Sequence, residues 1–387
     1  MTDTTLIDNT LTIYQSLRED EDDDSLPPVV ADFVYEKRLQ PRFGGTLTLG
    51  AGLDTTYRFS GEDGDIGRDV TRAGAFARWN HDWIFDPGVV ATFTSGIRAD
   101  AYNVQDDSDF EENDVRLVPE VAVTFRWPWA TTTSTGASHL IEPIFQIAAS
   151  EDFGGTPPNE DSTRNEFDQG NILTLSRFAG DDAVETGIRA AFGGTWTRAG
   201  TGGTFTTLGF GRVVRQDADE NFSPSSGLDT ERSDWLLAGQ IQMANGFAFD
   251  ARALFDDETE ITRAAGLINW RDEKLSLSAA YIWQDADAEE DRLDTLSEWT
   301  VDAAYDIDDT WSVSGSARYD LAEDRPVRAA LGVGWQNECV SIDLSASRRY
   351  TVSSTDSPTT SFGLSGTIRG FSAGRSVGGP SARCDHE

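Results

Sequence analysis

The residues best suited to recognition chemistry lie in one stretch, from Pro157 to Gly193, which reads PPNEDSTRNEFDQGNILTLSRFAGDDAVETGIRAAFG. Carboxylates, amides and guanidinium groups alternate there with single aromatic residues, and no strand or helix period holds before Leu173. Such groups form salt bridges and charge-assisted hydrogen bonds. We therefore expect an ordered loop around which other elements pack. Its candidate binding residues are Asn159, Asp161, Arg164, Glu166, Asp168, Asn171 and Arg177.

The same sequence contains little evidence for a catalytic site. The histidines are His81, His139 and His386, and none lies in a metal-ligand or nucleophile motif. A serine hydrolase is the enzyme alternative, but no histidine is placed beside a serine and an orienting carboxylate or amide. The residues from Asp285 to Asp291 lack calcium-loop spacing, so a solvated loop is favoured over a divalent-cation site. The sequence predicts no enzyme, no metal site and no cofactor.

Composition narrows the class of protein. The 31 Lys and Arg face 67 Asp and Glu, a formal charge of −36, which makes a nucleic-acid partner improbable. No apolar run reaches the roughly 18 to 20 residues of a membrane-spanning helix. Glycine, tryptophan and phenylalanine are abundant, which suits sheets rich in turns and aromatic residues. A transmembrane barrel remains open, because its strands need only about 10 residues of alternating character.

Short segments in which apolar and polar residues alternate begin at Ala31. The polar stretch lies between two runs of such predicted strands. Segments such as ADFVYEKRL and GTLTLGAGLDTTYRF show this period in the first half. In the second half we expect strands at residues 232–243, 247–255, 261–270, 275–284, 297–306, 311–320, 327–336, 340–350 and 360–371.

The connections between these strands alternate in length. Short turns are expected at residues 244–246, 272–273, 307–309 and 337–338. Longer, acidic connections are expected at residues 256–260, 285–296, 321–326 and 351–359. Short and long connections on alternate ends are typical of an up-and-down outer-membrane barrel with tight periplasmic turns and longer external loops.

The two faces of the predicted strands also differ. In KLSLSAAYIW the odd positions from Leu275 to Trp283 share an apolar face, opposite Ser276, Ser278 and Ala280. Apolar side chains outward and polar ones inward are what a lipid-embedded barrel requires. A water-facing β-sandwich shares this alternation but does not predict turns sorted by end. The tryptophans expected in an aromatic girdle near strand ends are Trp235, Trp270, Trp283, Trp299, Trp311 and Trp335.

The sequence therefore predicts an all-β fold, an antiparallel up-and-down transmembrane β-barrel of about 16 to 18 strands. We expect an acidic lead-in or loop at residues 1–28, the barrel region at 29–371, and a periplasmic tail at 372–387. The first residues lack the basic and apolar regions of a signal peptide. If the protein is exported, we expect the sequence to be a fragment or a mis-started gene model.

Several motifs carry a resemblance to a known family. In order, they are HLIEPIFQIAAS, PNEDSTRNEFDQGNILTLSRFAG, NECVSIDLSASRRYT and TTSFGLSGTIRGF. Together they resemble the lipopolysaccharide-assembly outer-membrane protein family, LptD, from about residue 26 to residue 371. The specific features are PNEDS, the EFD triplet, the RF pair and the Asn-Glu-Cys before a strand, in the right order.

The resemblance implies a protein that inserts lipopolysaccharide into the outer leaflet of the outer membrane. In the family, a periplasmic β-jellyroll receives lipopolysaccharide from a periplasmic bridge and precedes a large barrel. A lipoprotein plugs the lumen, and opening between the first and last strands releases the lipid. This chain would be the C-terminal part of that barrel, and its bridge would act through a missing N-terminal domain. The implied partners are lipopolysaccharide, the lipoprotein, the bridge and the membrane.

The resemblance also implies a role for the cysteines. Cys339 matches a position that forms a disulfide to the N-terminal domain in the family, where a second cysteine often stands in place of Val340. Cys384 follows the last strand and is expected in the same oxidising compartment. A bridge between Cys339 and Cys384 is the local alternative.

Two function classes remain open, a lipid-translocating assembly barrel and a passive porin or solute channel; a soluble acidic β-protein is a weaker third. The polar stretch at residues 157–171 and Cys339 favour the first, since diffusion needs neither. We expect this stretch to fold into or beside the lumen, with Asp161, Arg164, Glu166 and Asp168 in buried pairs that fix a plug-facing surface. The inward arginines Arg252, Arg263 and Arg318 would meet either sugar phosphates or carboxylates across the lumen.

Overall fold

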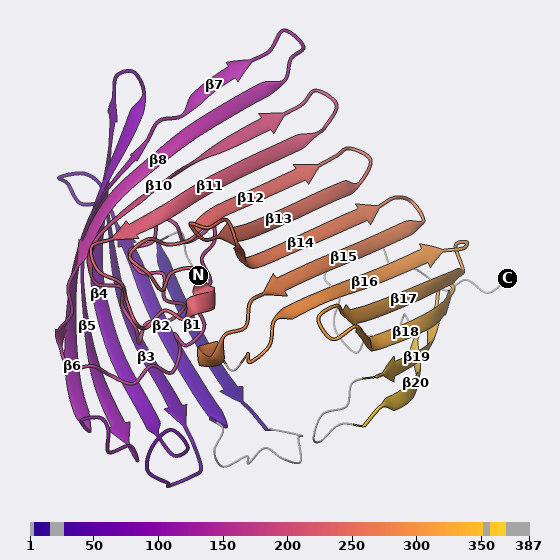
Figure 1. Cartoon of the computed structure of the whole chain (residues 1–387), viewed down its shortest axis with the longest axis horizontal. Helices are drawn as coiled ribbons and strands as arrows, with labels where there is room; N and C mark the ends of the chain where they lie inside the picture. The colour runs from indigo at the N-terminus through magenta and orange to yellow at the C-terminus, as the bar shows by residue number, and fades with distance from the viewer. Residues whose placement is uncertain (1–3, 16–26, 291, 351–356, 369–387) are drawn as a thin grey trace.

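The computed structural model describes residues 4–15, 27–290, 292–350 and 357–368, and almost all of them belong to one antiparallel sheet (Figure 1). The sheet has 20 strands, and successive strands along the chain are hydrogen-bonded neighbours apart from local detours at β7 and β9. Two short 3-10 helices lie in connections, η1 at Pro224–Ser226 and η2 at Ala288–Glu290. None of the helices in the described part of the chain has the length and apolar character needed to cross a membrane.

The first half of the chain contains long strands and two short ones, β7 and β9. They are β1 (Thr5–Ile13), β2 (Val29–Leu39), β3 (Thr46–Tyr57), β4 (Asp69–Phe85), β5 (Val89–Gln105), β6 (Asn113–Arg126), β7 (Trp129–Thr132), β8 (Ser138–Ser150), β9 (Phe153–Gly154) and β10 (Gly187–Ala199).

The strands of the second half follow as successive hairpins. They are β11 (Phe205–Arg215), β12 (Trp235–Gln242), β13 (Phe247–Phe255), β14 (Ile261–Arg271), β15 (Leu275–Gln284), β16 (Leu296–Asp306), β17 (Trp311–Asp320), β18 (Arg325–Gln336), β19 (Val340–Arg349) and β20 (Thr359–Ile368). The all-β, up-and-down antiparallel prediction is confirmed.

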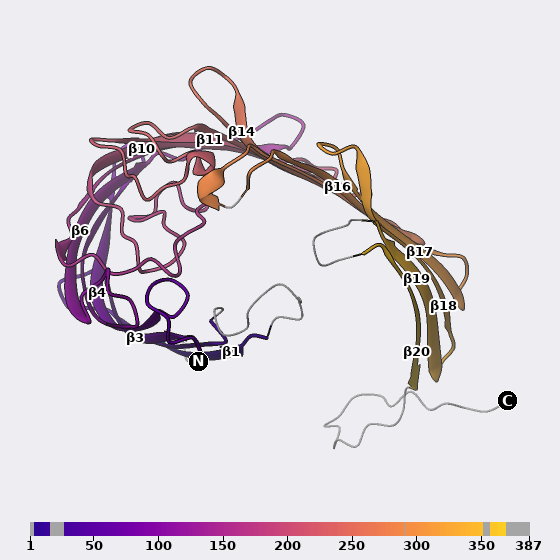
Figure 2. The ribbon, with the colours of Figure 1, turned by 60° about the horizontal axis from the view of Figure 1, so that its bottom comes forward.

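The sheet curls into an open arc with a concave and a convex side (Figure 2). Within the described residues, β1 pairs with β2 alone and β20 pairs with β19 alone. A right-handed strand twist, repeated over many neighbours, produces this curvature.

The connections are sorted by end, as the sequence predicts. Tight turns join β12 to β13, β14 to β15, β16 to β17 and β18 to β19. Longer connections join β13 to β14, β15 to β16 and β19 to β20 at the opposite end, where the β17–β18 connection is as short as the tight turns. The turn at Gly246 shows why some turns stay tight. Its φ is +82°, and a Cβ there would lie 1.8 Å from the carbonyl oxygen of Arg271, so only glycine fits.

Alternate residues of each strand face opposite sides of the sheet. In β6, Arg116, Val118 and Ala122 are buried on the concave side, while Leu117 and Phe125 are exposed. A soluble protein would bury such large apolar residues; their exposure along many strands is the pattern of a lipid-facing surface.

The structure corrects the predicted strand count from about 16 to 18 to 20. One additional strand is β1, which lies in the expected lead-in and pairs with β2 along its whole length. The other two are β7 and β9, which are short. Pro128, which cannot donate to a ladder, stands between β6 and β7. The expected tail at 372–387 lies outside the described residues.

Candidate functional site

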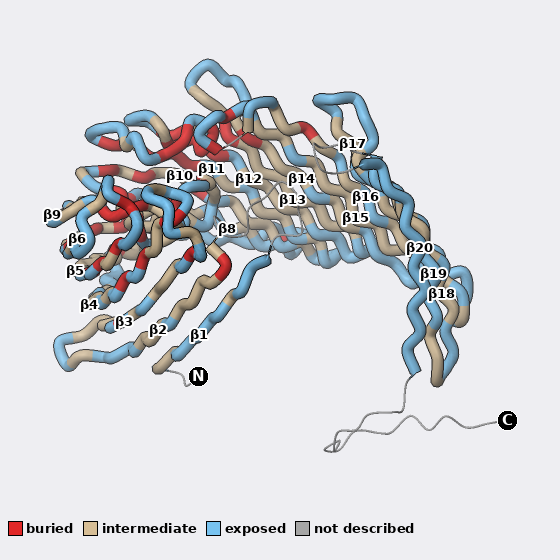
Figure 3. The backbone as a smooth tube through the Cα atoms, turned by 90° about the horizontal axis from the view of Figure 1, so that it is seen from below, coloured by how far each residue is buried: buried red, intermediate tan, exposed pale blue. Residues whose placement is uncertain are grey.

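The connection from β9 to β10 lies on the concave side of the sheet (Figure 2). We call residues 155–186 the lumenal segment. It contains no helix or strand, yet much of it is buried, so it is an ordered loop as the sequence predicts. Figure 3 shows buried residues gathered around this segment and the adjoining strands, while β17 to β20 are intermediate or exposed.

An apolar cluster anchors the lumenal segment to the wall. Phe167, Ile172 and Phe178 of the segment pack with wall residues of β10 to β13 and with two residues of the β11–β12 connection. Phe178 and Phe222 are stacked with ring centroids 4.1 Å apart. The wall and connection residues of this cluster are Ala191, Val213, Phe222, Leu228, Leu236 and Leu254.

Side-chain to backbone hydrogen bonds hold the irregular path of the segment. Asp161 accepts hydrogen bonds from the backbone N–H groups of Asp181 and Asp182. Asp168 Oδ1 accepts from Gly170 and Asn171, at 2.7 and 3.0 Å. Asp and Asn are suited to this work because their short side chains mimic a backbone turn. Their abundance in the segment replaces the hydrogen bonds that a regular strand would supply.

The deepest ion pairs centre on Glu185. Its Oε2 accepts a hydrogen bond from Arg177 Nη1 at 2.7 Å, and its Oε1 accepts one from Nε of Arg215 on β11. Arg189 on β10 lies 4.0 Å from the same carboxylate. Burial opposes ionisation of Glu185, but the surrounding arginines outweigh it and hold the pKa of Glu185 below its usual range. The carboxylate therefore stays charged and joins the segment to two wall strands.

A second set of pairs fastens the start of the segment to the β3–β4 region. Glu160 accepts hydrogen bonds from Arg58 Nη2 at 2.8 Å and from Arg68 Nε at 2.6 Å. Arg68 also donates to Asp107 of the β5–β6 connection at 2.9 Å. Three long connections are thus linked through two arginines, Arg58 and Arg68, and two carboxylates, Glu160 and Asp107.

The end of the segment contacts strands β4 to β6. Arg72 of β4 lies 3.3 Å from a carboxylate oxygen of Asp181 and 3.6 Å from one of Asp182. Arg116 of β6 donates to the backbone carbonyls of both residues. Burial, reinforced by the charge of Asp161, raises the pKa of Asp182 to about 6. The charge of Asp182 therefore changes just below neutral pH.

The predicted binding residues occupy different environments in this site. Arg177 is buried, Asn159, Glu166, Asp168 and Asn171 are half-buried, and Asp161 and Arg164 are exposed. Arg252 pairs with Glu166 and lies 3.6 Å from Asp168. For Arg164, the hydrogen bond found is a 3.5 Å contact with the carbonyl of Glu290 near η2. The prediction of buried pairs is wrong for Arg164, which faces solvent. Asp161 lies 4.0 Å from the buried Arg72, but the Asp161 side chain is itself 40% exposed.

The sequence did not identify four residues whose ion pairs fasten the lumenal segment to the surrounding structure. They are Glu160, Asp182, Glu185 and Arg215. Glu160 and Glu185 lie in the singled-out stretch, but nothing local distinguishes a buried carboxylate from an exposed one. Arg215 ends a strand far along the chain, and only the fold brings it to Glu185. The three arginines expected to face inward all meet carboxylates: Arg252 meets Glu166, Arg263 meets Glu290, and Arg318 meets Glu298.

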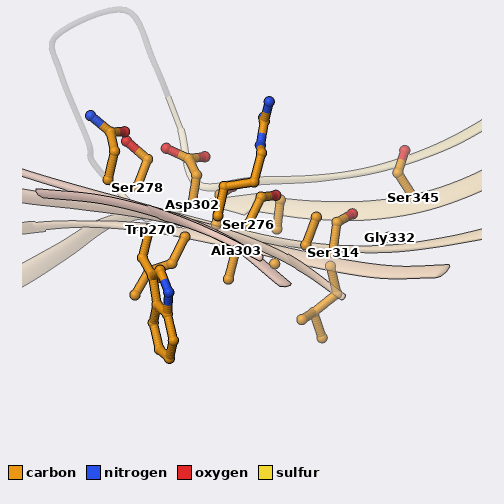
Figure 4. Close-up of a pocket in the computed structure, with 16 residues that line it drawn as sticks. Trp270, Ser276, Ser278, Asp302, Ala303, Ser314, Gly332 and Ser345 are labelled. Carbon is orange, nitrogen blue, oxygen red and sulfur yellow. The ribbon is translucent and has the colours of Figure 1, made fainter. Parts of the chain in front are cut away.

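The concave face beyond the segment carries short polar side chains. Figure 4 shows Ser278, Asp302 and Ser345 on one side of the sheet and Trp270 on the other. Cross-strand pairs continue this row, since Ser278 lies opposite Asp302 and Asp302 opposite Ser316. The lumenal side of β15 to β19 is therefore hydrophilic, in contrast to the side at β4 to β13 that the lumenal segment covers.

Cys339 lies in the tight turn between β18 and β19, and its backbone N–H donates to the side chain of Asn337 at 3.0 Å. This is the end that carries the other tight turns. Cys384 lies outside the described residues, so a bridge between the two cysteines stays a prediction.

A curled antiparallel sheet with lipid-type and hydrophilic faces, sorted connections and a segment folded onto its concave side defines a β-barrel protein of the outer membrane. The family model LptD, "LPS transport system D", matches residues 10–296. The chain belongs to this family, whose members are transport proteins rather than enzymes and insert lipopolysaccharide into the outer membrane.

Comparison with solved structures finds a transporter and a receptor of low similarity. The copper transporter OprC is 10% identical with a TM-score of 0.36, covering 88% of this chain and 64% of that one. BauA, the ferric preacinetobactin receptor from Acinetobacter baumannii, is 11% identical with a TM-score of 0.36, covering 87% and 65%. The chain thus spans less than two thirds of the length of either structure. No match was found among the curated proteins.

Proposed function

We propose that this chain forms part of the barrel wall through which lipopolysaccharide is inserted into the outer leaflet. Membership of the LptD family supports this proposal. The observation that carries it is the division of the concave face. One part is filled by the lumenal segment, and the other is lined by short polar side chains such as Ser278 and Ser345.

This division suits an amphipathic cargo better than free diffusion. A hydrophilic, uncrowded wall can accommodate a saccharide chain while the acyl chains remain in the bilayer. A porin gains nothing from an apolar cluster and a buried Glu185 that fill its lumen. The passive channel remains the second candidate, since the hydrophilic face of β15 to β19 would also pass small solutes.

The lumenal segment is proposed to present a surface to a plugging lipoprotein. Arg58, Arg116 and Arg215 hold its outer side. Glu166 and Asp168 pair with Arg252 of β13 but stay partly exposed, and their exposed sides are proposed to face the lipoprotein. The periplasmic bridge for lipopolysaccharide is proposed to act through a domain attached to the N-terminal side. Cys339, at the tight-turn end, would be the tether.

Depletion of this protein in its host tests the proposal. Surface lipopolysaccharide should fall while uptake of a small hydrophilic solute through existing pores stays the same, and re-expression of the full-length gene should restore the surface lipid. The opposite pattern, unchanged surface lipopolysaccharide with reduced solute uptake, would establish the channel instead.

A further inference from the structure

The convex side of β12 to β14 carries a depression in the lipid-type surface. Small residues occupy neighbouring outward positions there, and Gly239, Ala251 and Gly266 stand directly opposite one another in a single row across three strands. Ala253 and Ala264 form the adjacent row. Their outward direction follows from alternation, because Leu236, Arg252 and Arg263 on the same strands contact the lumenal segment or pack against it.

The small residues form the floor of the depression, and large residues surround them. Leu208 and Leu237 stand on one side, and Phe249 and Ile268 close the end nearest the tight turns. Tyr281 and Trp299 form the opposite wall. The depression has a volume of about 560 Å³. We call it the convex cup.

The aromatic wall of the convex cup is held in place. The rings of Tyr281 and Trp299 lie 5.0 Å apart. The Tyr281 hydroxyl is 3.2 Å from the hydroxyl of Ser297. Because the tyrosine oxygen is engaged in this way, the cup presents hydrocarbon and ring surfaces rather than a hydrogen-bonding group.

We propose that the convex cup binds one acyl chain of a bilayer lipid. Its volume falls in the range of small-molecule pockets, about 300 to 1,000 Å³, and its outward walls carry no charge. A headgroup would find no partner on such a surface. A chain seated between the side walls touches protein on several sides, whereas a chain against a flat wall touches it on one, so dispersion contacts favour the cup.

A second copy of the protein is the competing occupant. A specific protein interface needs at least about 1,000 Å² of buried surface with good complementarity. The rims of the cup, Leu208, Leu237 and Trp299, project past its floor and hold another barrel wall away from the glycines. A narrow flexible chain reaches the floor without this obstacle.

Filling the cup tests the proposal. At Gly266 an added Cβ would meet nothing nearer than 3.9 Å, so Gly266→Leu projects into the cup without a clash. Ala317→Leu is the matched control, since Ala317 is exposed on the same convex face, on β17 and outside the cup. Ala253→Leu is a second cup-filling variant should Gly266→Leu fail to fold, as judged by heat-dependent gel mobility.

The measurement is native mass spectrometry of the full-length protein in detergent, titrated with dipalmitoylphosphatidylcholine and with its single-chain lyso form. Both probes should bind the wild type, because one chain is sufficient. Gly266→Leu should lower occupancy by roughly fivefold or more, and Ala317→Leu should match wild type. Equal lipid retention by both variants overturns the proposal. So does a wild-type dimer that Gly266→Leu converts to monomer, which would assign the cup to a second copy.

Discussion

Glu185 of the lumenal segment accepts a 2.7 Å hydrogen bond from Arg177, and the carboxylate also pairs with Arg215 of the barrel wall. All three side chains are at most 2% exposed. Arg177 belongs to the segment itself and Arg215 to β11, so one carboxylate closes the segment on itself and fastens it to the wall. The arrangement holds only while Glu185 carries its charge, since two guanidinium groups would otherwise be buried without it.

Glu185→Gln is therefore expected to destabilise the lumenal segment by about 3 to 5 kcal/mol, because neutralising it leaves both arginines uncompensated. Hydrogen exchange of residues 155–186 in the detergent-solubilised protein should rise sharply. Glu166→Gln is the control, since Glu166 is 40% exposed, and it should cost about 1 kcal/mol or less. Similar exchange in the two variants would show that the buried pair does not hold the segment.

Gly211→Ala is expected to displace the segment by contact rather than by charge. A Cβ at Gly211 would lie 1.9 Å from Cδ1 of buried Ile172, so Ile172 must move. Overpacking of this kind costs about 1 to 3 kcal/mol. Gly209→Ala, on the same strand and face, has its nearest contact at 3.6 Å and should be close to neutral. Thermal unfolding and protease sensitivity of the segment distinguish the pair; equal values would place Ile172 elsewhere.

Asp182 gives the segment a pH dependence. Its folded pKa of about 6 lies above the ordinary value of 3.8, so its contribution to stability is complete below about 3.8 and is lost as the pH rises through 6. The lowered pKa of Glu185 has the opposite effect on stability, because its contribution is lost as the pH falls. That loss occurs only below the ordinary pKa of 4.5. Between pH 7.5 and 5 the segment should gain about 1 to 1.5 kcal/mol of protection, from roughly 1.36 kcal/mol per pKa unit.

Hydrogen exchange at the two pH values, corrected for the intrinsic rate, measures this gain. Asp182→Asn should abolish the difference, whereas Asp257→Asn, in an exposed loop, should leave it intact. A pH effect that survives in Asp182→Asn would assign the titration to another group.

Non-reducing gels test the cysteine prediction. If Cys339 pairs with an upstream cysteine of a longer protein or with Cys384, Cys339→Ser should change mobility only in the absence of reductant. Cys384→Ser separates the two cases, because it changes mobility only if the local bridge forms. A Cys339→Ser variant that runs like wild type without reductant contradicts both pairings.

Local patterns predicted the strands well because period two and turn residues are properties of short stretches. The tight turn at Gly246 and the two faces of β15 follow from neighbours in sequence. The predicted number of strands was too low where the alternation of apolar and polar residues was weak. Strand β1 is polar on much of its length, and its strand character comes from pairing with β2. The burial of site residues could not be predicted from the sequence either, because Arg215 and Glu185 meet only when the sheet curls.

Asp168→Ala is expected to impair assembly with the proposed lipoprotein. Asp168 accepts two backbone hydrogen bonds within the segment and lies beside Arg252, so its loss loosens the lumen-facing surface. Asp256 is a matched control, because its carboxylate accepts from the backbone N–H groups of Glu258 and Glu260 in an outer loop. Both changes remove a turn cap worth about 1 kcal/mol. Only Asp168→Ala should reduce the lipoprotein recovered with the full-length barrel, by roughly tenfold for each 1.4 kcal/mol lost. Equal recovery would mean that the segment is an ordinary loop and that the plug contacts another part of the wall.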